Sequence, residues 1–173
     1  MTKNRYTLVG INFDAMNEKK GFNFDELVFN NIKESESIFD GDVLKFWDGL
    51  GWGHQFFYNG EAWESSEEES FDEVYENGIP TGSAFFYLSR EKDSAADPVS
   101  VSFAGAVSAT GKTLIAPKNR LTLISNPYPS NFDVDKDVTF TNVLEGESIF
   151  DGDVLKFWDG LGWGHQFFFN GES

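Results

Sequence analysis

One stretch of 26 residues occurs twice in this chain and constrains the fold more than any other feature. Residues 36–61 read ESIFDGDVLKFWDGLGWGHQFFYNGE, and residues 147–172 repeat them with one change, Tyr58 to Phe169. Two nearly identical segments have the same turn residues and the same alternation of apolar and polar residues, so we expect them to adopt the same local structure. The chain is therefore built around a duplicated element.

The repeat extends beyond this segment. The motif NRYTLV at residues 4–9 returns as NRLTLI at residues 119–124, where Ile124 replaces Val9 as a core position allows. We therefore predict two domains, a first complete β-repeat unit at residues 1–118 and a half-length second unit at residues 119–173 packed on the first. The spacing of 111 residues between the long copies (147 minus 36) is too long for a solenoid.

The spacing of apolar residues and turn residues predicts an all-β protein. Asn59-Gly60 is a strong signal for a hairpin with a type I′ turn. We expect antiparallel hairpins that form a sandwich or a barrel-like core. The segment at residues 24–29 fits either a short helix or a strand. The predicted strands lie at residues 5–9, 42–47, 53–58, 61–65, 83–89, 98–107 and 121–125.

The charge excludes several classes of partner. The formal net charge is -16, which opposes binding to nucleic acid and to anionic membrane surfaces. The chain has no cysteine, which excludes disulfides and thiol chemistry. No apolar run is long enough to insert into a membrane, and no signal peptide opens the chain. A secreted or surface location would therefore require a signal that is absent from this sequence.

The two copies of the hairpin continue differently after their Asn-Gly turns. After Asn59-Gly60 the first copy continues into a strand with Trp63, whereas no such strand comes after Asn170-Gly171. Residues 164–169 are thus expected to expose a strand edge, which invites a partner. We predict that residues 5–9 of the same chain cover this edge in a monomer, because the net charge opposes self-association. The alternative is an edge-paired dimer.

Several motifs resemble those of a bacterial protein family. The motifs are LISNPYPS, GDVLKFWDG, YNGEAW, PTGSAFFYLS and VSFAGAV. In this order they are similar to the tandem β-repeats of secreted proteins from Verrucomicrobia and related phyla. The resemblance covers nearly the whole chain, and it implies a fold and an extracellular location rather than one activity. Within this group the chain looks like a secreted protein of a mucin-degrading gut bacterium with acid, aspartic-type peptidase activity, which would imply a mucin glycoprotein substrate.

An aspartic peptidase needs two carboxylates that share a proton, and two related halves often supply one each. The duplication provides three such pairs, but the flanking residues differ from the hydrophobic-Asp-Thr/Ser-Gly pattern of pepsin-like enzymes. Asp-Gly is also a common sequence in tight turns, so a structural role of these aspartates in turns stays open. The spacing fits no EF-hand, and we expect no metal or other cofactor. The catalytic candidates are Asp40, Asp42 and Asp48, with their partners Asp151, Asp153 and Asp159.

Aromatic residues are the candidates for ligand binding. Sugar rings stack on indole and phenol rings through their apolar faces. These positions therefore predict a surface protein that engages host glycoprotein (mucin) or glycan, with the acid peptidase as the alternative function. Aromatic core packing also explains them, because one face of each strand must be buried. The candidates are Trp47, Trp52, His54 and Tyr58 in the first copy, and Trp158, Trp163 and His165 in the second.

Two further expectations concern the surroundings of the first hairpin. Residues 61–76 carry eight carboxylates and no basic residue, which predicts a solvated loop or, alternatively, a cation site. Because copy two has Phe169 in place of Tyr58, we expect the Tyr58 hydroxyl to lie at the surface or to bond a group that copy two lacks, such as the segment after Glu61.

Overall fold

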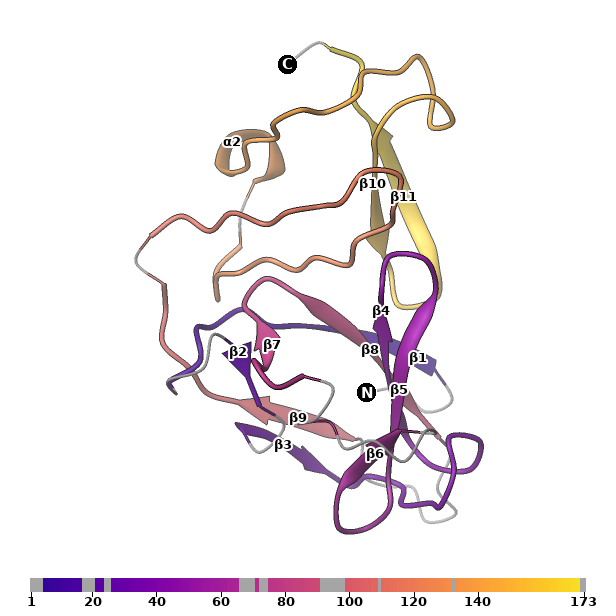
Figure 1. The fold of residues 1–173 in the computed structure, drawn as a ribbon. Helices are drawn as coiled ribbons and strands as arrows, with labels where there is room; N and C mark the ends of the chain where they lie inside the picture. The colour runs from indigo at the N-terminus through magenta and orange to yellow at the C-terminus, as the bar shows by residue number, and fades with distance from the viewer. Residues whose placement is uncertain are drawn as a thin grey trace. The chain divides into compact units, whose positions relative to one another are not determined.

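A computed structural model describes residues 5–16, 21–23, 26–65, 71, 75–90, 99–108, 110–131 and 133–171. The chain divides into two compact units, residues 1–129 and 130–173. Strands, all paired antiparallel, make up nearly all the regular secondary structure of the described residues, so the prediction of an all-β protein is confirmed (Figure 1). Within the described ranges, no helix has the length and hydropathy needed to cross a membrane.

The elements of the first unit are β1 (Arg5–Gly10), β2 (Gly21–Phe22), β3 (Leu27–Asn30), β4 (Val43–Trp47), β5 (Trp52–Tyr58), β6 (Trp63–Ser65), β7 (Ile79–Pro80), β8 (Ala84–Ser89) and β9 (Ser100–Phe103). Those of the second unit are α2 (Val134–Asp137), β10 (Val154–Trp158) and β11 (Trp163–Phe168).

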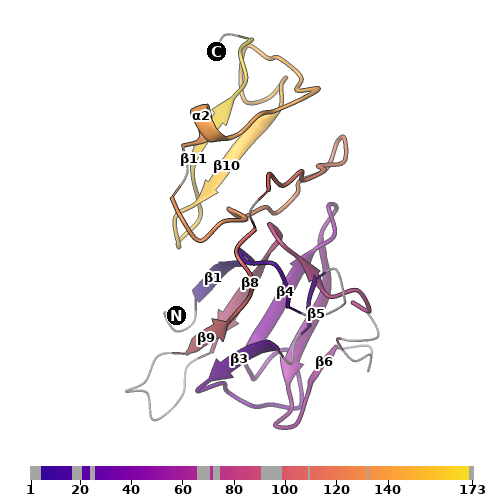
Figure 2. The ribbon, with the colours of Figure 1, turned by 90° about the vertical axis from the view of Figure 1, so that its left-hand side faces the viewer.

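A five-stranded antiparallel sheet organises the first unit. Its order is β1-β8-β4-β5-β6, so β8 joins the hairpin of β4 and β5 to the N-terminal strand. Two shorter ladders, β2 with β7 and β3 with β9, belong to the same unit. Figure 2 shows β3 and β9 in front of the larger sheet. The arrangement is that of an open sandwich, because the sheet ends at β1 and β6.

Aromatic side chains fill the space between these layers. Phe46 of β4 contacts Phe56 of β5 and Phe85 of β8, with ring centroids 5.9 and 5.3 Å apart. Phe29 of β3 stacks on Tyr87 of β8 at 5.7 Å, which joins the β3–β9 ladder to the sheet. These rings belong to the buried core of the first unit, and burial of apolar surface is the main favourable term in folding.

The connection between β5 and β6 differs from the predicted type I′ turn. Such a turn requires positive φ at both central residues. Gly60 has a φ of 105°, but Asn59 is not among the residues with positive φ. Instead, Asn59 Oδ1 accepts hydrogen bonds from the backbone N–H groups of Glu61 and Ala62, both at 2.8 Å. The Asn side chain therefore closes the turn.

Three expectations about strands need correction or refinement. Residues 121–125 form no strand, and only Ile124 makes a bridge, with Ser83. Of the described residues 99–107 in the alternating segment, four form β9, and Ala106 makes an isolated bridge with Asp14. The ambiguous segment ends in strand β3, while residues 24 and 25 lie outside the described part of the chain.

The prediction that the N-terminal strand covers residues 164–169 is wrong. Strand β1 pairs with β8 along its whole length, from Arg5 opposite Ser89 to Gly10 opposite Ala84. Among the described strands, β1 has β8 as its only neighbour, and β11 has only β10, so no ladder joins the N-terminal strand to the second hairpin.

The hairpin of the second unit repeats that of the first. Val154 lies opposite Phe168 as Val43 lies opposite Phe57, and the same irregularity in register precedes each tryptophan pair. The prediction that the two 26-residue copies form matching hairpins is confirmed. In the second unit, however, the described strands form a sheet of β10 and β11 alone.

Candidate functional site

Asp42 is a buried structural carboxylate. It lies just before β4 and has no exposed surface. Its Oδ2 accepts hydrogen bonds from the Tyr87 hydroxyl at 2.7 Å and from the backbone N–H of Lys33 at 3.0 Å, while Oδ1 accepts from the N–H of Arg90 at 2.6 Å. Burial, together with the negative charge of Asp42, raises the pKa of Tyr87 above its usual range. Asp42 thus joins the loop before β4 to the end of β8.

Asp48 and Asp159 close the tight turns of the two hairpins. Asp48 Oδ1 accepts hydrogen bonds from the N–H groups of Leu50 and Gly51 at 2.7 and 2.8 Å. Asp159 Oδ1 makes the same pair of contacts in the second unit, at 2.8 and 2.9 Å. These backbone donors lower the pKa of both carboxyl groups, because they stabilise the ionised form.

The other three aspartates also have local partners. The Ser37 hydroxyl donates to Asp40 at 3.0 Å. The N–H and hydroxyl of Ser148 donate to Asp151 at 2.8 and 2.9 Å, and they lower its pKa. Asp153 accepts from the N–H of Leu144 at 2.9 Å. Each of these carboxylates therefore stabilises the loop that precedes its hairpin.

These contacts match turn chemistry better than proton transfer. In an aspartic peptidase one of the two carboxyls holds a proton at acid pH, which requires a raised pKa. The pKa values of Asp48, Asp151 and Asp159 move in the opposite direction. No cluster of three or more His, Asp or Glu residues suited to a metal ion lies within the described ranges.

Trp52 is the aromatic candidate that combines exposure with firm support. Its side chain is 42% exposed. Its ring lies nearly parallel to that of Tyr6, with centroids 6.2 Å apart and an interplanar angle of 10°. Trp47 and Phe86 contact it edge-on, each at 5.4 Å. Three neighbours from β1, β4 and β8 therefore hold the exposed indole in one orientation.

Lys45 completes this arrangement. Its Nζ lies 5.4 Å from the ring centroid of Tyr6 and 5.6 Å from that of Trp52. A cation at this distance is attracted to the faces of both rings. We call Tyr6, Lys45, Trp47 and Trp52 the aromatic platform. It lies on the side of the sheet opposite the Phe46 core.

His54 and Tyr58 belong to the other side of the sheet. The His54 ring lies 6.2 Å from both Phe56 and Tyr75. Burial, aided by the charge of Asp48, raises the pKa of Tyr75 to about 12. The Tyr58 ring packs against Trp63 at 5.5 Å. The predicted ligand-binding set therefore separates into the platform and a pair that packs toward the core.

Among the described residues, the Tyr58 hydroxyl bonds within its own turn. It donates to the carbonyl of Gly60 in its own turn, at 2.9 Å. Copy two has the equivalent glycine, Gly171, so this bond is not to a group that copy two lacks, and of the two expectations only a position at the surface stays a prediction. Of the acidic segment at residues 61–76, residues 66–70 and 72–74 lie outside the described part, and with them the question of a cation site.

The second unit reproduces the hairpin's own aromatic contacts. Trp158 meets Trp163 at 5.4 Å and 79°, close to the geometry of Trp47 and Trp52. His165 lies 6.3 Å from Phe167, as His54 lies near Phe56. The residue that matches Tyr6 in the sequence repeat is Leu121, which has no aromatic ring.

Sequence reasoning missed Tyr6, Lys45 and Phe86. Lys45 is the one lysine within an otherwise apolar strand, and a lysine between Leu44 and Phe46 points to the opposite face from them. This alternation could have indicated that Lys45 lies on the face opposite the core. The partners Tyr6 and Phe86 are brought to Trp52 only by the order of strands in the sheet.

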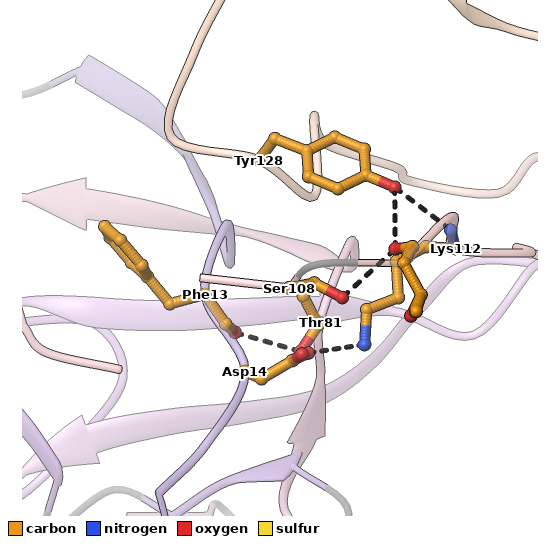
Figure 3. Close-up of polar contacts among 7 residues, drawn as sticks. Phe13, Asp14, Thr81, Ser108, Lys112 and Tyr128 are labelled. Atoms are coloured by element: carbon orange, nitrogen blue, oxygen red, sulfur yellow. Dashed lines mark hydrogen bonds and ion pairs between the residues drawn. The ribbon is translucent and has the colours of Figure 1, made fainter. Parts of the chain in front are cut away.

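A separate polar cluster fastens the segment after β9 to the first unit. Asp14 accepts hydrogen bonds from Lys112 Nζ at 2.6 Å and from the Thr81 hydroxyl at 2.9 Å (Figure 3). Lys112 also donates its backbone N–H to the Tyr128 hydroxyl at 3.1 Å. The hydrogen bond from Lys112 lowers the pKa of Asp14. These hydrogen bonds hold the segment after β9 against the loop that contains Asp14.

None of the protein families, curated proteins and solved structures compared with this chain matches it.

Proposed function

We propose that this protein is a secreted or surface-attached module that binds glycans, including those of host mucin glycoprotein, through the aromatic platform. The observation that carries the proposal is the exposed indole of Trp52, held by Tyr6, Trp47 and Lys45. The Trp52 indole presents apolar surface to water, and its neighbours hold that surface in one orientation. An apolar surface that is exposed and held in this way favours ligand binding. The extracellular location rests on the resemblance to secreted β-repeat proteins.

Sugar binding fits the chemistry of the platform. The nearly parallel rings of Tyr6 and Trp52 offer flat π surfaces to the C–H faces of a sugar. Because the rings are already held by their neighbours, little conformational entropy is lost when a ligand stacks on them. The net charge of -16 favours neutral sugars over sialylated or sulfated ones.

The duplicated hairpin offers a matched test. Neutral oligosaccharides released from mucin are titrated against the full chain by calorimetry, with intact mucin tested by pull-down. Trp52→Ala is expected to weaken binding at least about tenfold, because the variant loses the ring on which the sugar stacks. Trp163→Ala, the same change in the second copy, is expected to leave the affinity unchanged. Tyr6→Leu, which introduces the residue of the second copy, is expected to weaken binding.

Three results would overturn the proposal. They are the absence of saturable binding, equal losses in Trp52→Ala and Trp163→Ala, and binding that prefers anionic over neutral glycans. The same samples are incubated with mucin from pH 3 to 8. Cleavage near pH 4 to 5 that pepstatin blocks would favour the acid peptidase instead.

A further inference from the structure

The second hairpin has an open edge where the first hairpin holds a third strand. In the first unit β4 lies between β5 and β8, and Val43, Leu44 and Lys45 lie opposite residues of β8. In the second unit β10 pairs with β11 and with no other strand of the described chain. The sequences of the two hairpins are the same at every position of β4 and β10. The first unit therefore serves as a template for the strand that the second can bind.

The carboxylate at the start of the strand shows the same difference. Asp42 accepts hydrogen bonds from Lys33, Tyr87 and Arg90. Asp153 keeps the first contact, with the N–H of Leu144 taking the place of Lys33. Among the described residues, no hydroxyl and no second N–H donates to the Asp153 side chain, and this residue is exposed. The two donors that β8 and its following residue supply to Asp42 have no counterpart here.

Two phenylalanines of the second hairpin are exposed where their counterparts in the first hairpin are buried. Phe56 is 0% exposed, whereas its counterpart Phe167 is 56% exposed. Phe46 and Phe157 differ in the same way, at 6% and 44%. A contiguous apolar surface beside an open strand edge is typical of a site that receives another strand.

We propose that the second hairpin is an acceptor for an extended polypeptide segment with the chemistry of β8. The incoming strand lies antiparallel to β10 and places an apolar residue opposite Val154, a tyrosine opposite Leu155 and an aromatic residue opposite Lys156. Its tyrosine hydroxyl donates to Asp153, as Tyr87 donates to Asp42. This inference does not depend on glycan binding.

The remaining contacts of the template are also available. Arg90, the residue after β8, donates from its guanidinium group to the carbonyls of Ile38 and Gly41, at 3.2 and 3.3 Å. The second copy has Ile149 and Gly152 at the same positions. The partner segment therefore carries a basic residue three positions after its tyrosine. Strand addition supplies backbone hydrogen bonds, and these side-chain contacts select the sequence.

The probe is a synthetic peptide with the sequence GSAFFYLSR, which is that of residues 82–90. It is fluorescently labelled and titrated into the full chain, and hydrogen exchange locates the binding site. We expect saturable binding and new protection of the amides of residues 154–156. The same peptide with Phe in place of Tyr is expected to bind about tenfold more weakly, because it lacks the hydrogen bond to a carboxylate.

Variants of the protein separate this contact from a general effect of charge. Asp153→Asn keeps an oxygen acceptor for Leu144 and is expected to weaken binding of the tyrosine peptide about tenfold. Asp151→Asn removes the same charge two residues away and is expected to leave binding unchanged. If the hydroxyl and the carboxylate interact, combining the Phe peptide with Asp153→Asn weakens binding no further than either change alone.

Several outcomes would overturn the proposal. One is no binding of the peptide, and another is equal binding of a scrambled peptide of the same composition. A third is protection that appears in residues 43–47 instead of 154–156. A fourth is an affinity that neither Asp153→Asn nor the Phe peptide changes.

Discussion

The hydroxyl of Tyr87 donates a hydrogen bond to the carboxylate of Asp42 at 2.7 Å, and both side chains are fully buried. The two residues are 45 positions apart in the chain. Their contact joins the end of β8 to the loop before β4, in the middle of the five-stranded sheet. A carboxylate in this position is tolerated because three donors surround it.

Replacement of Tyr87 by Phe should therefore destabilise the first unit. The ring remains, but a buried carboxylate oxygen loses its hydroxyl donor. Hydrogen bonds to charged groups contribute about 1.5–3 kcal/mol, and we expect a loss of that size in the free energy of unfolding. Urea denaturation monitored by tryptophan fluorescence measures it.

Two other tyrosines are matched controls for this change. Tyr58 donates to the Gly60 carbonyl in a turn, and Tyr128 makes its contacts with Thr110 and Lys112 in an exposed loop. Tyr58→Phe and Tyr128→Phe should each cost less than about 1 kcal/mol, because water replaces these bonds. A loss above about 2 kcal/mol in Tyr58→Phe would contradict the partly exposed position of its hydroxyl.

The two hairpins should respond differently to the same core substitution. Phe56→Ala removes a fully buried ring and should cost about 3–5 kcal/mol in the free energy of unfolding. Phe167→Ala changes the equivalent residue, which is 56% exposed, and should cost less than about 1 kcal/mol. Similar costs in the two variants would show that Phe167 is buried in solution.

The turn of Asp48 should contribute to the loss of stability in acid. Its pKa is lowered in the folded protein by the N–H groups of Leu50 and Gly51. A group with a lowered folded pKa contributes stability that is complete above its unfolded pKa of about 3.9 and is lost as the pH falls through the folded value. Asp48→Asn keeps the turn's acceptor and should reduce the dependence of stability on pH below about pH 4. Denaturation curves from pH 2 to 6 test this, and an unchanged slope in the variant would contradict it.

The ion pair of Lys112 with Asp14 should contribute little to stability. Both side chains are about one-third exposed, at 29% and 31%, so solvent screens their attraction. Lys112→Met should lower the free energy of unfolding by less than about 1 kcal/mol, with a smaller difference at high salt. Denaturation at 0.05 and 1 M NaCl measures this dependence. A salt-independent loss would show that packing of the lysine stem, rather than charge, stabilises the segment.

Local features of this protein could be predicted from its sequence. The duplicated hairpin, its two strands and the third strand with Trp63 follow from alternation and turn residues, which act over a few neighbours. The turn role of Asp48 was also accessible, since an aspartate before glycine bonds to the next backbone N–H groups. The strand expected at residues 121–125 was wrong, because a strand requires a partner as well as a suitable sequence.

The platform could not be predicted in the same way. Trp52 and Lys45 lie in one repeat, but Tyr6 comes from β1 and Phe86 from β8. Their contact depends on β8 pairing with both β1 and β4, which no short-range pattern specifies. Non-local pairing is chosen by the total burial of the sheet rather than by any one segment.

The two copies of the repeat show which features depend on local sequence and which depend on contacts with distant strands. Within each copy, residues 36–61 or 147–172, the sequence determines the register of the hairpin. It also determines the turn whose N–H groups bond to Asp48 or Asp159, because these interactions lie inside the segment. The same residues do not determine why Phe56 is buried and Phe167 is exposed. Nor do they determine why Asp42 accepts a hydrogen bond from a tyrosine hydroxyl, a contact not observed for Asp153. Only the tertiary structure decided these, because burial and the second hydrogen bond come from β8, a strand distant in the chain.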